Sequence, residues 1–314
     1  MHNILVILGP TASGKTKLAA QLAYRLNGEI ISADSRQVYR DMNIGTGKDY
    51  PDYQVQGSTI PYYLIDIADA GTRYNLHQYT LDFKTAFDKI QLKNKLPVLC
   101  GGSGLYIQAA LNNLAFTKIP VDKQLRIELS QMNLVQLKQL FTKLDPTPYS
   151  NLADLSTAKR CIRAIEISRY LLSNSDFKQD DSNELKPLII GLNPSLPVRR
   201  KRIAERLSLR RNNGLIEEIK GLLKRGVDPA MFEYYGLEYK FVWRYLNGQM
   251  SEDALFELLE IAIQQYAKRQ MTFFRKLEKD GMLIHWIDGD LPVSTQIEEC
   301  LQLTIAAGFN CKIT

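Results

Sequence analysis

Eight residues near the amino terminus, Gly9 to Thr16, read GPTASGKT and fit the phosphate-loop pattern GxxxxGK[ST]. The glycines let the backbone curl so that successive N–H groups converge on phosphate oxygens, while the lysine adds positive charge and the final hydroxyl can bind Mg²⁺. The pattern therefore predicts binding of a di- or triphosphate. The residues expected to bind it are Gly9, Thr11, Ala12, Ser13, Gly14, Lys15 and Thr16, with Thr16 as the metal ligand.

Two other segments carry groups that suit chemistry on a phosphate compound. Asp34 follows the apolar segment 29–33, and Ser103 lies in the glycine-rich turn CGGSGLY at 100–106. If both follow strands of one parallel sheet, they emerge at the same edge as the phosphate loop, where open α/β sheets bind ligands. Asp66, at the end of the segment YYLID, could be the acidic residue that holds the Mg²⁺ water shell in ordinary NTPases, or only a loop carboxylate.

An arginine-rich segment, 199–211, has seven basic residues among its thirteen and a single acidic one. At helical spacing Arg199, Arg202, Arg206 and Arg210 fall on one side, which suits RNA phosphates or a merely solvated basic face. A second basic segment, 266–276, includes Tyr266, Phe273 and Phe274. These aromatic side chains could stack on bases or belong to the core.

Hydrophobic patterning indicates the elements that position these groups. Short apolar runs predict strands at 4–8, 29–33, 62–67, 97–100, 188–192 and 282–287. Helical spacing predicts helices at 17–26, 79–90, 197–211, 214–224, 251–279 and 294–307, with Ser251 capping the long one. Strands that alternate with helices favour an α/β fold: a P-loop NTPase-like parallel sheet flanked by helices.

Between residues 115 and 155 the pattern changes. Pro120, Pro146 and Pro148 lie on either side of a helical stretch at 125–144, and no strand-like run is present. We therefore expect an all-helical insertion at 115–155 within a core formed by 1–114 and 156–314. The core should resume with a helix that begins after Ser156 as its N-cap, and the polar segment 173–184 should form a solvated loop.

Composition excludes several classes of protein. The 314 residues are 45% hydrophobic and 24% charged, which is typical of a globular chain and rules out wholesale disorder. No apolar run is long enough for a membrane span, so we expect a cytosolic protein without a membrane partner. We also expect a monomer. Four cysteines, Cys100, Cys161, Cys300 and Cys311, form no CxxC pair and are expected to be inert thiols. The net charge of +6 permits a nucleic-acid partner without requiring one.

Four blocks occur in a fixed order: GPTASGKT, then ADSRQVYRDMNIGTGK from Ala33, GGSGLY from Gly101 and YAKRQMTFFR from Tyr266. Together they resemble the bacterial tRNA dimethylallyltransferase family. The resemblance implies that the phosphate loop holds dimethylallyl diphosphate with Mg²⁺ as cofactor. The exocyclic amine of the adenine 3′ of the tRNA anticodon then attacks the allylic carbon, and diphosphate is released.

The resemblance also assigns roles to individual residues. Asp34 would accept the proton of the amine, Ser103 replaces the threonine usual beside the leaving oxygen, and Arg206 would stabilise the departing diphosphate. The positions matching tRNA-contacting residues are Ser35, Arg36 and Gln37, and, in and after the insertion, Arg126, Lys159, Arg160 and Arg163. The insertion itself is expected to contact the anticodon stem-loop.

Three other functions fit the same sequence. A nucleotide or small-molecule kinase would use the phosphate loop for phosphoryl transfer. A prenyltransferase acting on free adenine nucleotides would share the motifs without needing to grip tRNA. An NTP-gated RNA-binding switch would perform no chemistry on its partner.

Overall fold

The structure is a computed structural model that describes residues 2–111, 115–174, 177 and 185–309. Two compact units are present: a sheet unit formed by Met1–Leu111 with Leu185–Thr314, and a helical insertion formed by Asn112–Glu184. Most of the expected solvated loop at 173–184 and the thiol of Cys311 lie outside the described residues. Each unit is described by itself below.

A six-stranded sheet forms the centre of the sheet unit, in the order β5-β2-β6-β1-β7-β8. Every pair of neighbouring strands is parallel. The strands are β1 (Ile4–Leu8), β2 (Gly28–Ser32), β5 (Tyr62–Tyr63), β6 (Leu96–Gly101), β7 (Pro187–Asn193) and β8 (Ile284–Asp288). The predicted P-loop NTPase-like α/β fold is confirmed.

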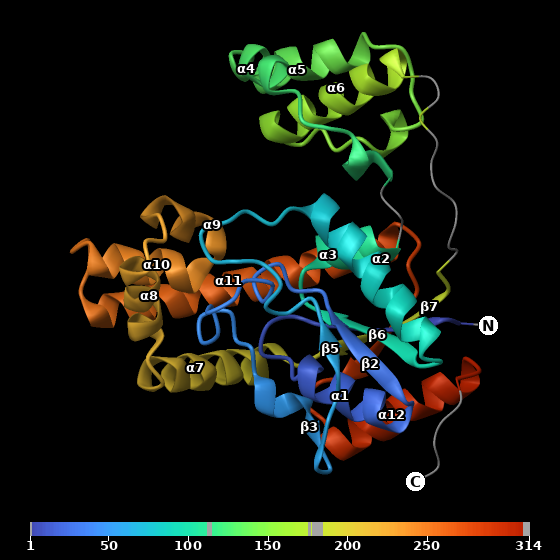
Figure 1. The fold of residues 1–314 in the computed structure, drawn as a ribbon, viewed down its shortest axis with the longest axis vertical. Coiled ribbons are helices and arrows are strands. Elements are labelled where there is room, and N and C mark those ends of the chain that lie inside the picture. Colours follow the sequence, from blue (N-terminus) through green and yellow to red (C-terminus); the bar gives the residue numbers. More distant parts are fainter. Residues whose placement is uncertain (1, 112–114, 175–176, 178–184, 310–314) are drawn as a thin grey trace. The chain divides into compact units, whose positions relative to one another are not determined.

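Helices cover both faces of this sheet (Figure 1). One face packs against α1 (Lys15–Arg25) and α12 (Val293–Ala306), and the other against α2 (Leu76–Leu92), α3 (Gly104–Leu111) and α11 (Glu252–Lys279). Side chains alternate along a strand, so those of β1 enter two hydrophobic clusters. Leu5 and Ile7 pack on the face covered by α1 and α12, and Val6 and Leu8 pack on the face covered by α2, α3 and α11. Burial on both faces explains why β1 reads as a continuous apolar run.

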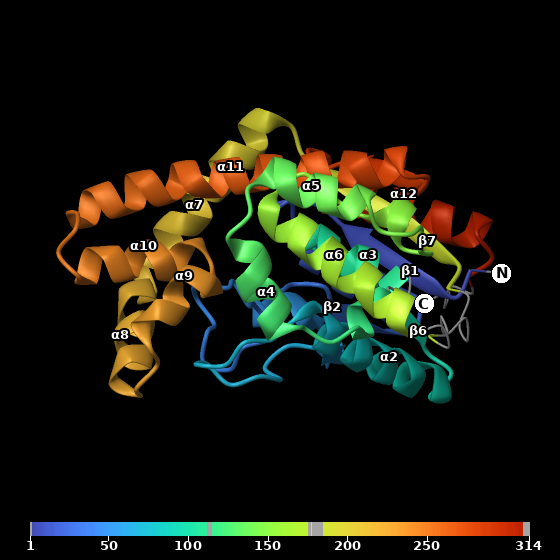
Figure 2. The same cartoon turned by 90° about the horizontal axis from the view of Figure 1, so that it is seen from above.

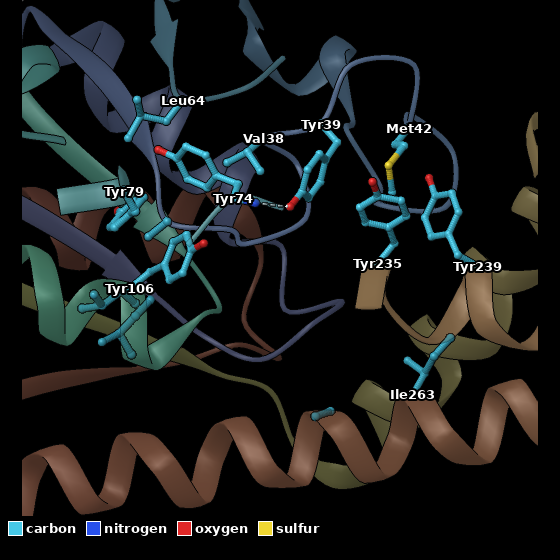
Figure 3. Close-up of a cluster of buried hydrophobic side chains, with 14 of the residues drawn as sticks. Val38, Tyr39, Met42, Leu64, Tyr74, Tyr79, Tyr106, Tyr235, Tyr239 and Ile263 are labelled. Carbon is cyan, nitrogen blue, oxygen red and sulfur yellow. Dashed lines mark hydrogen bonds between the residues drawn. The ribbon is translucent and has the colours of Figure 1, made fainter. Parts of the chain in front are cut away.

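A second group of helices packs along the amino-terminal half of α11 (Figure 2). It consists of α7 (Leu196–Asn212), α8 (Leu215–Lys224), α9 (Phe232–Tyr235) and α10 (Leu237–Leu246). The short helices α9 and α10 were not predicted. A layer of buried tyrosines joins this group to the segment after β2: Tyr39 and Tyr235 have ring centroids 4.7 Å apart, and Tyr39 Oη accepts a hydrogen bond from Tyr74 N at 2.9 Å (Figure 3).

The strand predicted at 62–67 is correct only in its first two residues. Leu64 and Asp66 have φ values of 64° and 57°, in the left-handed region, so the chain leaves the sheet after Tyr63. A hairpin of β3 (Gln54–Val55) and β4 (Ser58–Thr59) precedes it, and single 3₁₀ turns lie at Tyr50–Tyr53 and Pro229–Met231. No helix among the described residues is long and apolar enough to cross a membrane.

The described part of the insertion is all-helical, as expected. It contains α4 (Lys123–Ser130), α5 (Leu134–Thr142) and α6 (Ala158–Ser173), with 3₁₀ turns at Ala115–Lys118 and Ser150–Leu152. The expected boundary at 155 differs from the structure, because Cys161 and Ile165 of α6 pack against Leu125 and Leu137 of the other two helices. The N-cap of α6 is Thr157 and not Ser156.

Candidate active site

A cavity of about 600 Å³ lies in the sheet unit, at the edge where the parallel strands end. Its wall brings together the phosphate loop, the segment after β2, the loop before β3, and side chains of α7, α9, α10 and α11. The predicted residues in this wall are Thr11, Ala12, Ser13, Gly14, Lys15, Thr16, Asp34, Ser35, Arg36, Gln37 and Arg206. Three segments far apart in sequence therefore converge as expected.

The phosphate loop has the backbone geometry of an anion-binding turn. Ala12 and Gly14 adopt left-handed φ values of 59° and 89°, and α1 begins immediately after Gly14. Successive N–H groups and a helix N-terminus are thereby directed toward the cavity. Lys15 Nζ donates to the Pro10 carbonyl at 3.2 Å, and burial lowers the pKa of its ammonium. Gly9 is absent from the wall, and a Cβ there would lie 2.8 Å from the Leu192 carbonyl oxygen.

The carboxylate of Asp34 is fixed by the turn that it begins. Its Oδ1 accepts hydrogen bonds from Arg36 N at 2.8 Å and from Gln37 N at 3.4 Å. Ser103 lies behind this turn and is not part of the cavity wall: its Oγ accepts a hydrogen bond from Ser35 N at 3.1 Å. Ser103 thus supports the segment that carries Asp34.

The arginine-rich helix α7 turns its basic side toward the cavity. Arg202, Arg206 and Arg210 line it, whereas Arg199 does not. Arg206 donates to the Gly47 carbonyl at 3.2 Å and forms an ion pair with Asp49. Burial and then the neighbouring Arg210 lower its pKa. The side of α7 that carries these arginines is therefore directed at the phosphate loop.

Arg210 is held by an acidic partner instead of being free for RNA phosphates. Its Nη1 contacts Glu238 Oε1 at 2.7 Å, and both side chains are largely buried. Glu238 lies 28 residues after Arg210, so the sequence gave no signal for this ion pair.

Glu218 of α8 was not predicted as part of the site. Its carboxylate accepts hydrogen bonds from the N–H groups of Asn43, Ile44 and Gly45 at 2.7, 2.7 and 3.0 Å, and from Tyr239 Oη at 2.7 Å. It thereby fixes the loop whose Gly47 carbonyl binds Arg206. On an amphipathic helix, an acidic residue such as this reads as ordinary solvated surface, so sequence gave no signal.

Helix α11 contributes three side chains to the wall: Ile263, Tyr266 and Gln270. Of the aromatic residues considered for RNA stacking, Phe274 is fully buried in the core, and Phe273 packs where a Cβ on Gly104 would lie. Only Tyr266 faces the cavity. Gln270 was overlooked, although the spacing of four residues from Tyr266 could have placed it on the same face.

Asp66 does not contribute to the cavity wall. Its carboxylate is paired with the ammonium of Lys48 at 2.5 Å and accepts a hydrogen bond from Tyr50 Oη at 2.6 Å. The Lys48 side chain has no solvent exposure, so the Asp66 carboxylate balances a buried charge. Asp66 is thus a structural residue and not the acidic residue of an NTPase metal site.

Oxygen donors suited to Mg²⁺ are nevertheless present in the cavity. They are the hydroxyl of Thr16 and the carboxylates of Asp34, Asp49 and Asp52. Burial, followed by the nearby Asp49, raises the pKa of Asp52. Mg²⁺ commonly binds through one or two protein oxygens together with substrate phosphates and water, and this donor set fits that chemistry.

In the helical insertion, two of the four residues predicted to contact tRNA form ion pairs with a buried carboxylate. Arg126 and Arg163 both bind Glu166, whose side chain is 2% exposed, with an Arg126 Nη2 to Glu166 Oε2 distance of 2.8 Å. Arg163 also donates to the Ile119 carbonyl at 2.7 Å. Lys159 and Arg160 are exposed, and Arg160 pairs with Asp154 at 2.9 Å.

Comparison with known proteins agrees with this geometry. The sequence model of the IPP transferase family matches residues 37–277. A tRNA dimethylallyltransferase 1 of Porphyromonas gingivalis is 49% identical over 308 residues, covering 97% of this chain and 100% of that protein. A tRNA dimethylallyltransferase 2 of Bacteroides fragilis is 46% identical over 296 residues, covering 94% of this chain and 96% of its own length.

Solved structures show the same relationship. The crystal structure of a tRNA isopentenylpyrophosphate transferase from Bacillus halodurans is 30% identical, with a TM-score of 0.71 over 98% of this chain and 96% of that one. A eukaryotic dimethylallyltransferase solved while acting on tRNA has a TM-score of 0.76 over 99% of this chain and 81% of that one, but at 22% identity it supports the fold alone. With the family model covering most of the sequence and relatives this similar along nearly its whole length, the chain belongs to the IPP transferase family.

Proposed function

We propose that the chain transfers the dimethylallyl group of dimethylallyl diphosphate to the exocyclic amine of the adenine 3′ of the anticodon in tRNA. The observation that carries the proposal is the placement of a phosphate loop and a fixed carboxylate, Asp34, in the wall of one cavity. Related proteins carry tRNA dimethylallyltransferase as their name. The volume of about 600 Å³ is within the range of cavities that hold small molecules.

The phosphate loop binds the diphosphate of the donor. Backbone N–H groups of 11–16 and the Lys15 ammonium surround its oxygens. Thr16 would hold Mg²⁺, which would supply neutralisation of the charge on the leaving group. Arg202 and Arg206 enter the same cavity from α7 and add positive charge beside the phosphate loop.

In the chemical step, the adenine nitrogen forms a bond to the allylic carbon while that carbon's bond to the diphosphate oxygen breaks. The diphosphate leaves with the electron pair of the broken bond, and the nitrogen loses one proton to Asp34. A carboxylate is suited to this role because the amine is a weak nucleophile until its proton is removed. Arg206 stabilises the departing diphosphate, and no phosphoryl group is transferred.

The acceptor must present an unstacked base, because the amine cannot reach a carboxylate inside the cavity while the base is paired or stacked. Ser35, Arg36 and Gln37 contact the nucleotide at the cavity wall. In the helical insertion, Lys159 and Arg160 are exposed and contact the tRNA backbone. The enzyme acts as a cytosolic monomer.

A kinase is the less favoured function, since Asp66 is engaged by Lys48 and Tyr50 and is unavailable for a metal. A prenyltransferase for free adenine nucleotides would share the same cavity. One experiment separates all readings: the full chain is incubated with labelled dimethylallyl diphosphate and, separately, labelled ATP, with unmodified tRNA or AMP as acceptor. Transfer of label from dimethylallyl diphosphate to tRNA and not to AMP supports the proposal. ATP turnover without prenylated RNA, or label on AMP alone, would refute it.

A further inference from the structure

The side chain of Gln270 joins two loops of the active site through one amide group. Its Oε1 accepts a hydrogen bond from Thr11 N at 2.8 Å, and its Nε2 donates to the Gly102 carbonyl at 2.9 Å. Thr11 belongs to the phosphate loop, whereas Gly102 precedes Ser103 in the turn after β6. Gln270 is 8% exposed; its hydrogen bond to Gly102 is buried, and its hydrogen bond to Thr11 is partly buried at the cavity wall.

The contacts around this amide leave little freedom. A Cβ added to Gly102 would lie 2.5 Å from Gln270 Nε2, so the turn approaches the amide as closely as glycine allows. The next residue, Ser103, has its Oγ 3.1 Å from Ser35 N, directly after Asp34. Two hydrogen bonds of Gln270, the peptide link from Gly102 to Ser103 and the hydrogen bond of Ser103 thus connect the phosphate loop to the segment that carries the carboxylate.

We propose that Gln270 is a positioning residue that fixes the phosphate loop relative to Asp34, and thereby aligns donor and acceptor. The inference rests on the proposed function for its catalytic consequence. Helix α11 is a suitable support because the side chains flanking Gln270 on its buried face, Ala267, Met271 and Phe274, are packed in the core. A site on a rigid helix holds its geometry better than one on a loop.

Only a side chain with a donor and an acceptor at one end can make both contacts. Methionine has nearly the same length and shape but can make neither strong hydrogen bond, so Thr11 N–H and the Gly102 carbonyl would both lose their partner. Glutamate is different: its protonated form has one acceptor and one donor and can replace glutamine. Its ionised form accepts only and would repel the Gly102 carbonyl oxygen.

The experiment compares the wild type with Gln270→Met, Gln270→Glu and the control Gln265→Met. Gln265 lies on the exposed side of the same helix and outside the cavity. Three quantities are measured on the full chain: the affinity for inorganic diphosphate with Mg²⁺ by calorimetry, the hydrogen exchange rate of the Thr11 amide, and the single-turnover rate of tRNA prenylation at saturating substrates from pH 6 to 8.

In Gln270→Met we expect diphosphate affinity and the saturating rate each to fall by about tenfold or more, with faster exchange at Thr11, because buried polar groups lose their partners. In Gln270→Glu the rate relative to wild type should rise as pH falls. Gln265→Met should behave as wild type. Gln270→Met with affinity and saturating rate within twofold of wild type would overturn the inference.

Two outcomes need separate reading. If thermal denaturation shows that Gln270→Met is unfolded, the glutamate variant decides: a saturating rate equal to wild type at every pH overturns the inference, and a rate that recovers only at low pH supports it. If the wild type binds diphosphate but prenylates neither tRNA nor AMP, the proposed function fails. The diphosphate affinities and the Thr11 exchange rates then still decide the role of Gln270.

Discussion

Replacement of Arg206 by alanine should separate catalysis from stability. The Arg206 side chain is 28% exposed and lines the cavity beside the phosphate loop, where charge is expected to develop on the leaving diphosphate. A preorganised group in such a place contributes about 3 kcal/mol to transition-state stabilisation, which corresponds to a loss of roughly 150-fold in rate. Its partner Asp49 is 47% exposed, so the ion pair should contribute at most about 1 kcal/mol to folding.

The assay is single-turnover prenylation of tRNA at saturating substrates, measured together with the free energy of unfolding in urea. Lys201→Ala is the matched control, because Lys201 lies on the same helix but is 77% exposed and outside the cavity. Arg206→Lys should restore only part of the rate, since an ammonium cannot reach the diphosphate and the Gly47 carbonyl with the same planar fork. A wild-type rate in Arg206→Ala, or a rate loss that matches a large loss of stability, would show that the reasoning is wrong.

Three further predictions concern the base, a buried ion cluster and a glycine. Asp34→Asn should slow single-turnover prenylation by roughly 10² to 10⁴-fold while diphosphate affinity, followed by calorimetry, stays within twofold, because asparagine keeps the acceptor oxygen that fixes the turn. Burial raises the pKa of Glu166, but hydrogen bonds with two arginines outweigh that effect and lower the pKa below 4.5. The ionised Glu166 carboxylate therefore stabilises the fold fully above pH 4.5, and this contribution is lost as the pH falls through the lowered pKa. Urea unfolding should show Glu166→Gln less stable than wild type by about 3 kcal/mol at neutral pH. This difference in the free energy of unfolding should become smaller at acid pH, and a difference independent of pH would contradict the prediction. Gly101→Ala should cost at least about 2 kcal/mol in thermal or urea unfolding, since its Cβ would lie 2.5 Å from the Ala33 carbonyl carbon; an unchanged midpoint would mean that β2 and β6 can separate.

Several features of the fold could be predicted because they depend on local pattern. The five apolar residues of β1 and the glycine-rich loop after it fix a strand, a turn and a helix start without help from the remainder of the chain. The boundary of the insertion could not be predicted in the same way. Helix α6 reads as an ordinary amphipathic helix, and only the partners of Cys161 and Ile165 assign it to the insertion.

The predicted site residues show the same division. Chemical type and motif spacing identified Lys15, Asp34 and Arg206, and the parallel sheet places all three in the wall of one cavity. Glu218 gave no comparable signal, because a lone carboxylate on an amphipathic helix has no distinctive spacing, and the signal for Gln270 was limited to its spacing of four residues from Tyr266. Their significance comes from hydrogen bonds to backbone groups of distant loops.

The sequence by itself determined the α/β class, the anion-binding loop and the family, since short motifs and strand-forming runs encode these locally. The tertiary structure decided which charged groups are available for chemistry. Asp66, Arg163 and Arg210 have the residue types of functional groups, yet each is neutralised by an opposite charge that packing brings close. The partners of these three groups, Lys48, Glu166 and Glu238, are largely buried, whereas Asp49, the partner of Arg206, is half exposed. Long-range contacts decide which of these two situations a charged group meets.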